Sequence, residues 1–254
     1  MDKTFGSLLK DWRNARRMSQ LNLGLAANVS ARHISFIETG RSKPSRSMVL
    51  QLSETLDVPR PQRNALLNAA GYSAAYRKRD LDADDMTHVR AAVEWTLARH
   101  DPFPAIAVDR YWAVVSANRS ANMLLAGIGV GVGDSMLEAI TRSPDVRATI
   151  DNWPDVARYM AARLRTESLH LGGDPVLDEA ADRLAREAGP LPADAAPLPA
   201  VVPTTYRAGG MVLSFISTLA QFGSAEDIAL ADLKIELMFP ADDATRDMLM
   251  AGAI

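Results

Sequence analysis

Five short helical periods follow one another within residues 4–70, and this pattern restricts the fold more than any other feature of the sequence. Ser19, Ser30 and Ser45 stand at helix starts, where a serine oxygen accepts a bond from a backbone N–H, and Pro61 suits the first turn of the fifth helix. Helices of this length are marginal alone in water, so their apolar faces must share one core. We therefore expect an all-α domain over residues 1–72.

Charge divides the chain in the same way. Residues 1–80 hold 14 Lys and Arg against 6 Asp and Glu, a balance of +8, whereas residues 81–254 hold 14 against 25, a balance of −11; together they give the net charge of −3. Clustered cations are typical of phosphate-binding surfaces, although a charge run is more often a solvated face. The basic and acidic parts are expected to meet different partners.

The connection between the second and third helical periods is tight. Two helices that cross steeply need a small residue at the contact and a turn residue that tolerates positive φ, and Gly24 and Asn28 meet these needs. With Ser30 as the next N-cap, this is a helix-turn-helix arrangement. Any small helical bundle could contain such a pair, so the neighbouring residues must decide.

The run from Met18 to Ser45 resembles the XRE family, the DNA-binding domains of phage repressors and Cro, and the resemblance covers residues 5–70. It rests on Ser19-Gln20, Val29-Ser30, Ile34, Ile37-Glu38, Gly40 and Pro44-Ser45, which stand in one register. Gly24 and Asn28 replace a family alanine and glycine. The resemblance implies binding to double-stranded DNA, and a homodimer on a palindromic operator, because one such domain reads only a few base pairs.

The third helix is expected to enter the major groove, with Arg32 as the best candidate for a guanine contact. Gln20 resembles a family position that grips a phosphate, and Arg13 and Glu38 match a family salt bridge between helices. The full set of expected DNA-binding residues is Gln20, Ser30, Ala31, Arg32, Ser35, Phe36, Arg41, Lys43 and Arg46.

The rest of the chain is predicted to contain both helices and strands. Residues 73–101 are expected to form a linker and a connecting helix, Met86–Arg99, and residues 102–254 an α+β domain. Strands are predicted at 105–109, 112–116, 201–207, 211–222 and 233–239, and helices at 118–125, 136–142, 153–167, 175–188 and from Asp242. The first two strands form a hairpin with a tight turn at Asp109-Arg110, and prolines make a loop of 189–203. Strands at both ends of the domain imply an antiparallel sheet closed by distant segments.

Four runs of this domain, at 109–118, 153–158, 203–218 and 230–242, resemble the MmyB-like ligand-binding domain. The resemblance implies a PAS-like fold, with helices over one face of the sheet, and a sensor for an apolar small molecule, with a fatty acid as the suggested class. The candidate ligand-binding residues are Trp112, Met123, Leu124, Leu137, Tyr159, Met160, Arg163, Leu164, Phe215, Phe222 and Met238. For any one of the apolar residues, a place in the core is the simpler interpretation, and Arg163 is one of three arginines that could meet a carboxylate.

No catalytic, phosphate-cradling or metal-binding motif stands in the sequence, and it has no cysteine, so we expect neither an enzyme nor a cofactor or metal. We find no signal peptide or membrane span, which predicts a cytoplasmic protein without a membrane partner. The sequence thus indicates a transcription regulator, expected to be a repressor. In the alternative interpretation, the second domain only dimerises or binds another protein.

Overall fold

The structure, a computed structural model, describes residues 3–79, 83–190, 201–208, 210–222 and 227–252. It divides into two compact units, the first made mainly of residues up to Lys78 and the second mainly of residues from Arg79 onward. Part of the predicted proline-rich loop, residues 191–200, lies outside the described residues.

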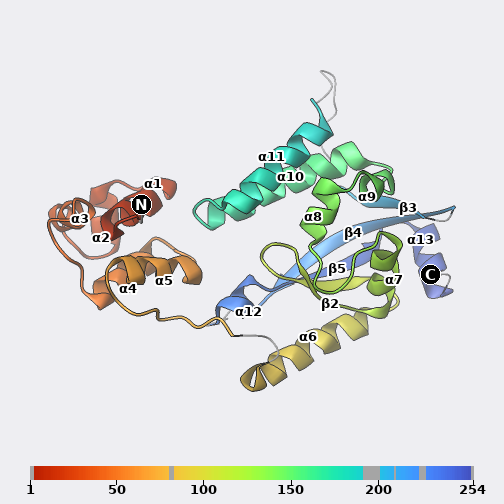
Figure 1. The fold of residues 1–254 in the computed structure, drawn as a ribbon, viewed down its shortest axis with the longest axis horizontal. Helices are drawn as coiled ribbons and strands as arrows, with labels where there is room; N and C mark the ends of the chain where they lie inside the picture. The colour runs from red at the N-terminus through yellow and green to blue at the C-terminus, as the bar shows by residue number, and fades with distance from the viewer. Residues whose placement is uncertain (1–2, 80–82, 191–200, 209, 223–226, 253–254) are drawn as a thin grey trace. The chain divides into compact units, whose positions relative to one another are not determined.

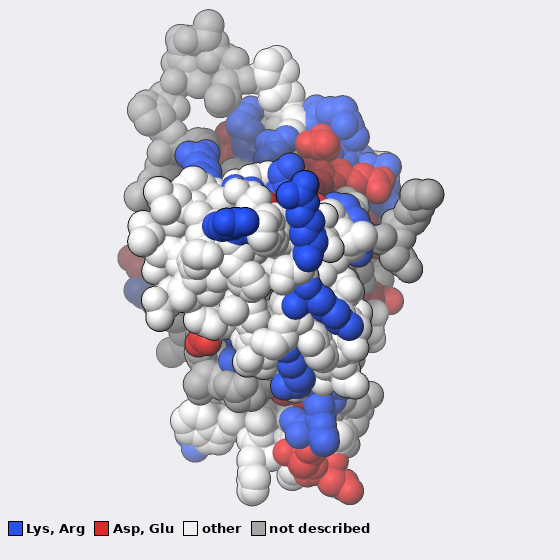
Figure 2. All heavy atoms as spheres, turned by 90° about the vertical axis from the view of Figure 1, so that its left-hand side faces the viewer, with Lys and Arg blue, Asp and Glu red and all other residues white. Residues whose placement is uncertain are grey.

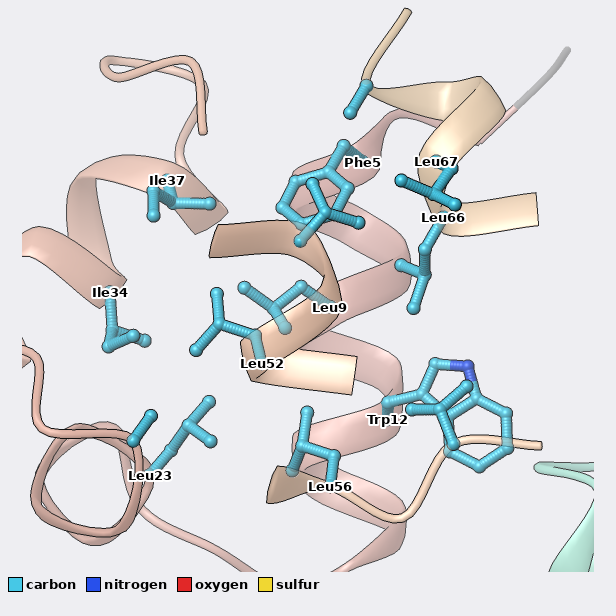
Figure 3. Close-up of a cluster of buried hydrophobic side chains, with 14 residues drawn as sticks. Phe5, Leu9, Trp12, Leu23, Ile34, Ile37, Leu52, Leu56, Leu66 and Leu67 are labelled. Carbon is cyan, nitrogen blue, oxygen red and sulfur yellow. The ribbon is translucent and has the colours of Figure 1, made fainter. Parts of the chain in front are cut away.

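The first unit is the predicted bundle of five helices (Figure 1): α1 (Phe5–Ala15), α2 (Gln20–Ala26), α3 (Ala31–Glu38), α4 (Arg46–Thr55) and α5 (Arg60–Ala69). Thr4, Ser19, Ser30 and Ser45 cap the first four helices through their side-chain oxygens. In Figure 3, side chains from all five helices converge on one core, and Leu9 and Leu52 are fully buried in it. Each helix therefore owes its stability to burial against the other four.

The second unit contains a five-stranded antiparallel sheet in the order β2-β1-β5-β4-β3. Its strands are β1 (Ala105–Val108), β2 (Val114–Ala117), β3 (Thr204–Ala208), β4 (Met211–Gln221) and β5 (Lys234–Pro240). Because β5 pairs with β1, segments from the two ends of the domain lie side by side, as the sequence predicted.

The helices of this unit are α6 (Thr87–His100), α7 (Arg119–Gly127), α8 (Met136–Arg142), α9 (Pro144–Ala148), α10 (Trp153–His170), α11 (Pro175–Ala188), α12 (Ile228–Asp232) and α13 (Asp243–Met250), with a short 3-10 turn at Asp84–Met86. The sequence did not predict α9 and α12, each of five residues, because a hydrophobic period cannot be recognised over little more than one turn. The final helix begins after Asp242, whose carboxylate caps it.

Helices cover both faces of the sheet, which corrects the expectation that they cover only one. On one face, α6 buries Val93 and Leu97 against Ala105, Ala107 and Ile235. On the other face, α7 and α10 lie over the sheet (Figure 1). The helix that the sequence assigned to the connection between domains is thus also part of the core of the second unit.

Two polar side chains fix the start of this unit. Asn118 caps α7 and is buried, and its amide also accepts a bond from Ala105 N and donates to Leu97 O and Phe103 O. The hairpin turn is longer than predicted: the Asp109 carboxylate accepts bonds from the backbone N–H groups of Tyr111 and Ala113, so β2 begins only at Val114. The strand predicted at 201–207 also begins later, at Thr204.

Candidate nucleic-acid interface and ligand cavity

The turn between α2 and α3 has the backbone that its sequence predicted. Asn28 adopts φ 52°, and a Cβ atom on Gly24 would lie 2.5 Å from the backbone oxygen of Val29. Only a residue without a side chain allows α2 and α3 to approach so closely. Gly6 plays the same part between α1 and α3, where a Cβ would lie 2.5 Å from Glu38 O. The sequence interpretation missed Gly6, because a single glycine in a helical period carries no signal of its own.

A buried ion pair holds α3 against α1. Arg13 Nε lies 2.6 Å from Glu38 Oε1 and Arg13 Nη2 lies 3.0 Å from Oε2, and the side chains expose only 10% and 3% of their surface. Burial raises the pKa of Glu38, but hydrogen bonds from Arg13 and Gln20 outweigh it and hold that pKa below its ordinary value. The structure therefore confirms the salt bridge that the resemblance implied.

Gln20 belongs to the same network. Its Nε2 donates to Glu38 Oε2 at 2.8 Å, which fixes the amide at the start of α2. A primary amide has two N–H donors, so one of them remains for a phosphate oxygen. The sequence interpretation expected the phosphate contact and did not foresee the bond to Glu38.

Four exposed cations of the first unit lie on α3, in the loop after it and at the start of α4. Arg32, Arg41, Lys43 and Arg46 are all exposed, and none of them forms a salt bridge with any described residue. Figure 2 looks at the side of the first unit on which α3 lies in Figure 1, and it shows lysines and arginines there among mainly uncharged residues. Unpaired cations on one face are the electrostatic feature that a phosphate backbone requires.

The ring of Phe36 lies beside two of these cations. The guanidinium carbon of Arg32 lies 5.2 Å from the centre of the Phe36 ring and that of Arg41 lies 5.9 Å from it. Cations within about 6 Å of an aromatic ring are attracted to its face. Phe36 thus brings together the predicted base reader on α3 and a predicted phosphate contact in the next loop.

The remaining predicted residues of the interface lie at the start of α3 or along it. Ser30 caps the helix, its Oγ accepting a bond from His33 N at 3.2 Å, while Ala31 and Ser35 are half-buried. Lys43 lies over the ring of Tyr72, whose hydroxyl donates to Pro44 O at 2.9 Å. This last bond ties the end of the first unit to the basic loop.

The second unit has an apolar cavity of about 210 Å³ between α7 and the sheet. Met123 and Leu124 of α7 face Ile106, Leu213 and Met238 of the sheet across it. Nearly all of the lining is hydrocarbon or thioether, so the cavity suits an apolar ligand. Of the predicted ligand-binding residues, Met123, Leu124 and Met238 lie here.

A smaller, more polar cavity of about 80 Å³ lies between α10 and the sheet. It is lined by six predicted residues: Trp112, Tyr159, Met160, Arg163, Phe215 and Met238. Met136, Tyr206 and Met238 line both cavities and therefore form the wall between them. Burial, with the charge of Glu236 adding to it, raises the pKa of Tyr206, so its phenol stays protonated in this wall.

Trp112 is the most unusual residue of the polar cavity. Its backbone adopts φ 62°, its side chain is buried, and its indole N–H has no hydrogen-bond partner among the described residues. The Arg163 guanidinium carbon lies 4.4 Å from the centre of its ring and the Lys234 amine 4.5 Å from it. The indole N–H of Trp112 and the guanidinium of Arg163 thus lie at a cavity that Glu236 also lines, and a donor beside a cation is an arrangement that can bind an anionic group.

Three predicted ligand-binding residues line neither cavity. Leu164 is fully buried, Leu137 lies on α8 beside Ala180 of α11, and Phe222 packs with α6 on the opposite face of the sheet. Conversely, the sequence interpretation missed Ile106, Tyr206, Leu213, Lys234 and Glu236, which line one cavity or both or approach Trp112. The alternation along the predicted strands could have found several of them, since residues two apart share a face.

Two family models match the chain. A helix-turn-helix domain model matches residues 4–66, and the model of the MmyB-like transcription regulator ligand binding domain matches residues 89–251. Both are regulator families and neither is an enzyme family, so the two resemblances read from the sequence are confirmed. Among curated proteins no significant match is found. No helix among the described residues has the length and apolar character that crossing a membrane demands.

Proposed function

The chain belongs to the transcription regulators that join a DNA-binding helix-turn-helix domain to an MmyB-like ligand-binding domain, and from this premise we propose that it is a repressor controlled by a fatty acid. It acts as a homodimer on a palindromic operator. The observation that carries the DNA part of the proposal is the group of exposed cations around α3 that have no acidic partner among the described residues. The apolar cavity beneath α7 supports the ligand part.

On the operator, α3 lies in the major groove, and Arg32 near its start reaches a guanine. Arg32 is held over Phe36, which limits the freedom that its side chain loses on binding. Arg41, Lys43 and Arg46 contact phosphates and position the domain without reading sequence. The second N–H of the Gln20 amide contacts a phosphate on the other side of the groove.

Two variants separate these roles. Arg32→Ala should relax specificity at one base pair of each half-site, at a cost of about 1–3 kcal/mol for the lost contact. Arg41→Ala should weaken binding to all duplexes alike. Both are measured against a panel of operator duplexes that differ at single positions. Identical profiles of the two variants across the panel would show that the division into reader and positioner is wrong.

For the ligand, the hydrocarbon chain occupies the apolar cavity, and its carboxylate lies toward Arg163 and the indole N–H of Trp112. Met136 and Met238, in the wall between the cavities, adapt to the chain because a thioether side chain is unbranched and flexible. The polar and apolar parts of one amphipathic ligand thus match the two cavities.

Filling the apolar cavity tests this placement. Ala121 lines the cavity and is buried, whereas Ala126 on the same helix is exposed. Ala121→Phe should abolish the rise in melting temperature that a long-chain fatty acid produces, while Ala126→Phe should leave that rise unchanged. Equal loss in both variants would mean that the fatty acid does not bind beneath α7.

The head group needs its own test. Arg163→Gln should remove the preference for a fatty acid over the alcohol of equal chain length, because only the acid requires a cation. Arg165→Gln is the matched control, since Arg165 is exposed on the same helix and paired with Asp182. If Arg163→Gln kept the preference for the acid, the head group would lie elsewhere.

Regulation requires that the ligand bind the DNA-competent and DNA-incompetent dimers with different affinity. Typical coupling of about 1–3 kcal/mol changes DNA affinity roughly 5- to 150-fold. The test is a titration of operator DNA with and without a long-chain fatty acid, using full-length protein. If no apolar ligand changes the affinity, the second domain serves only dimerisation or protein binding.

A further inference from the structure

Among the described residues, segments outside the sheet bond to part of each outermost strand, and a stretch of β4 forms an exception. Along β2, Val114 exchanges backbone hydrogen bonds with Gly133 and Asp134, at 2.7 and 2.9 Å. Along β3, Arg207 N donates to Thr149 O at 2.7 Å and Asp151 N donates to Thr205 O at 2.9 Å. Irregular segments therefore bond to both outermost strands, which is one way in which proteins protect sheet edges.

The exception lies along β4, which extends beyond its neighbour β3. β3 pairs with β4 only from Met211 to Phe215, whereas β5 pairs with β4 from Phe215 to Gln221. Among the described residues, no segment pairs with the other side of β4 beyond Phe215, and the segment 201–203 that enters β3 does not pair with it either. We call residues 217–221 of β4 the free edge.

The register shows which backbone groups point outward from the free edge. Met238 N donates to Pro104 O, so the backbone of Met238 is directed toward β1 and not toward β4. Its β4 partner, Ser217, therefore makes no ladder bond to β5, and the same alternation applies to Leu219 and Gln221. The N–H and C=O groups of Ser217, Leu219 and Gln221 thus all face the open side.

Sequence and exposure distinguish the free edge from an ordinary protected edge. All five residues of the free edge are exposed. The side chains of Ser217, Leu219 and Gln221 lie on the cavity face of the sheet, and those of Thr218 and Ala220 lie on the other face. The edge carries no charge and no proline, although charged residues and proline are the usual means of preventing strand addition. The free edge is uncharged and accessible, and its outward backbone groups are not paired with any described residue, which are the requirements for pairing with another strand.

We propose that the free edge pairs with the free edge of a second copy, so that the two sheets form one continuous antiparallel sheet across a two-fold axis. This proposal rests on the homodimer of the proposed function and gives that dimer its interface. In an antiparallel pair centred on Leu219, Leu219 faces Leu219 of the partner subunit, and Ser217 faces Gln221 of the partner subunit.

Only this register pairs all the outward-pointing N–H and C=O groups of Ser217, Leu219 and Gln221. Each opposed pair then exchanges both of its N–H···O bonds, and no like charges meet. A shift by two residues in either direction would place one outward residue against Phe215, which β3 already occupies, or beyond the end of β4 at Gln221. The edge is thus complementary to itself, which is what an isologous interface demands.

Cysteine cross-linking of the full chain tests the register directly. The sequence has no cysteine, so a single introduced thiol can form only intermolecular disulfides. Opposed residues of a hydrogen-bonded antiparallel pair have Cα atoms about 5.5 Å apart, within the range of a disulfide. Leu219→Cys should be converted mainly to a covalent dimer under mild oxidation. Val212→Cys, at an equally exposed position of β4 that is paired with β3, should remain monomeric in denaturing gel electrophoresis.

A charged substitution provides a second test of the proposed interface. Leu219→Lys places two ammonium groups opposite each other and should raise the dissociation constant of the dimer at least about tenfold, measured by sedimentation. Val212→Lys, with the same 39% starting exposure, should not change it. If the wild-type chain is dimeric and binds its operator but Leu219 variants neither cross-link nor dissociate, the interface lies elsewhere and the present proposal is wrong while the proposed function stands. If the wild-type chain is monomeric even on DNA, the homodimer itself fails.

Discussion

Neutralising Arg41 should reduce the salt dependence of operator binding by an amount that the structure allows us to calculate. Binding to duplex DNA releases counterions, and the slope of log K against log salt is about −0.9 for each phosphate neutralised. Arg41 is exposed and has no acidic partner among the described residues, so its charge is available to a phosphate. A dimer loses one such contact in each half-site with Arg41→Gln, and its slope should become less steep by about 1.8.

The assay is fluorescence anisotropy of a labelled operator, titrated with wild-type and variant protein between about 50 and 200 mM salt. Lys3→Gln is the control, because it removes the same charge from a lysine that already lies 2.8 Å from the Asp11 carboxylate on α1. Its slope should equal that of the wild type. An unchanged slope for Arg41→Gln would refute the assignment of Arg41 to the phosphates, and an equal change in both variants would show that only net charge matters.

Three further predictions concern stability. Gly24→Ala should destabilise the first unit by about 1–3 kcal/mol in urea unfolding, because the added Cβ would lie 2.5 Å from Val29 O. A variant as stable as the wild type would show that α2 and α3 can move apart without cost. Glu38→Gln should destabilise this unit at neutral pH. Since the pKa of Glu38 is lowered in the folded state, the advantage of the wild type should shrink as pH falls below about 4.3, and a constant difference would contradict the ion pair. Asn118→Ala should lower the melting temperature of the second unit, because the N–H groups of Ala105 and Ala121 lose their acceptor at a cost of about 1–3 kcal/mol each. If amide exchange became faster in α7 only, Asn118 would have a capping role alone.

The sequence by itself determined the first unit almost completely. Its helix starts depend on serine side chains that bond to backbone groups three residues away, and the turn between α2 and α3 depends on Gly24 and Asn28. These are local interactions, and local interactions can be read from neighbouring residues. The proposed DNA-binding surface follows from them, because once α3 and its register are fixed, the exposed positions around it are fixed too.

The second unit needed its tertiary structure. Its strands were predicted, and the sheet is closed by distant segments as expected, but no sequence pattern states that β5 lies between β1 and β4. A hydrophobic period shows which side of an element is buried and leaves open what it is buried against. Leu164 and Phe222 are therefore buried or packed away from the cavities, while Tyr206 lies in the wall between them. The cavities and the free edge of β4 exist only through strand pairing and helix packing over long distances in the chain, and such relations are set by the energy of the whole fold and not by any local segment.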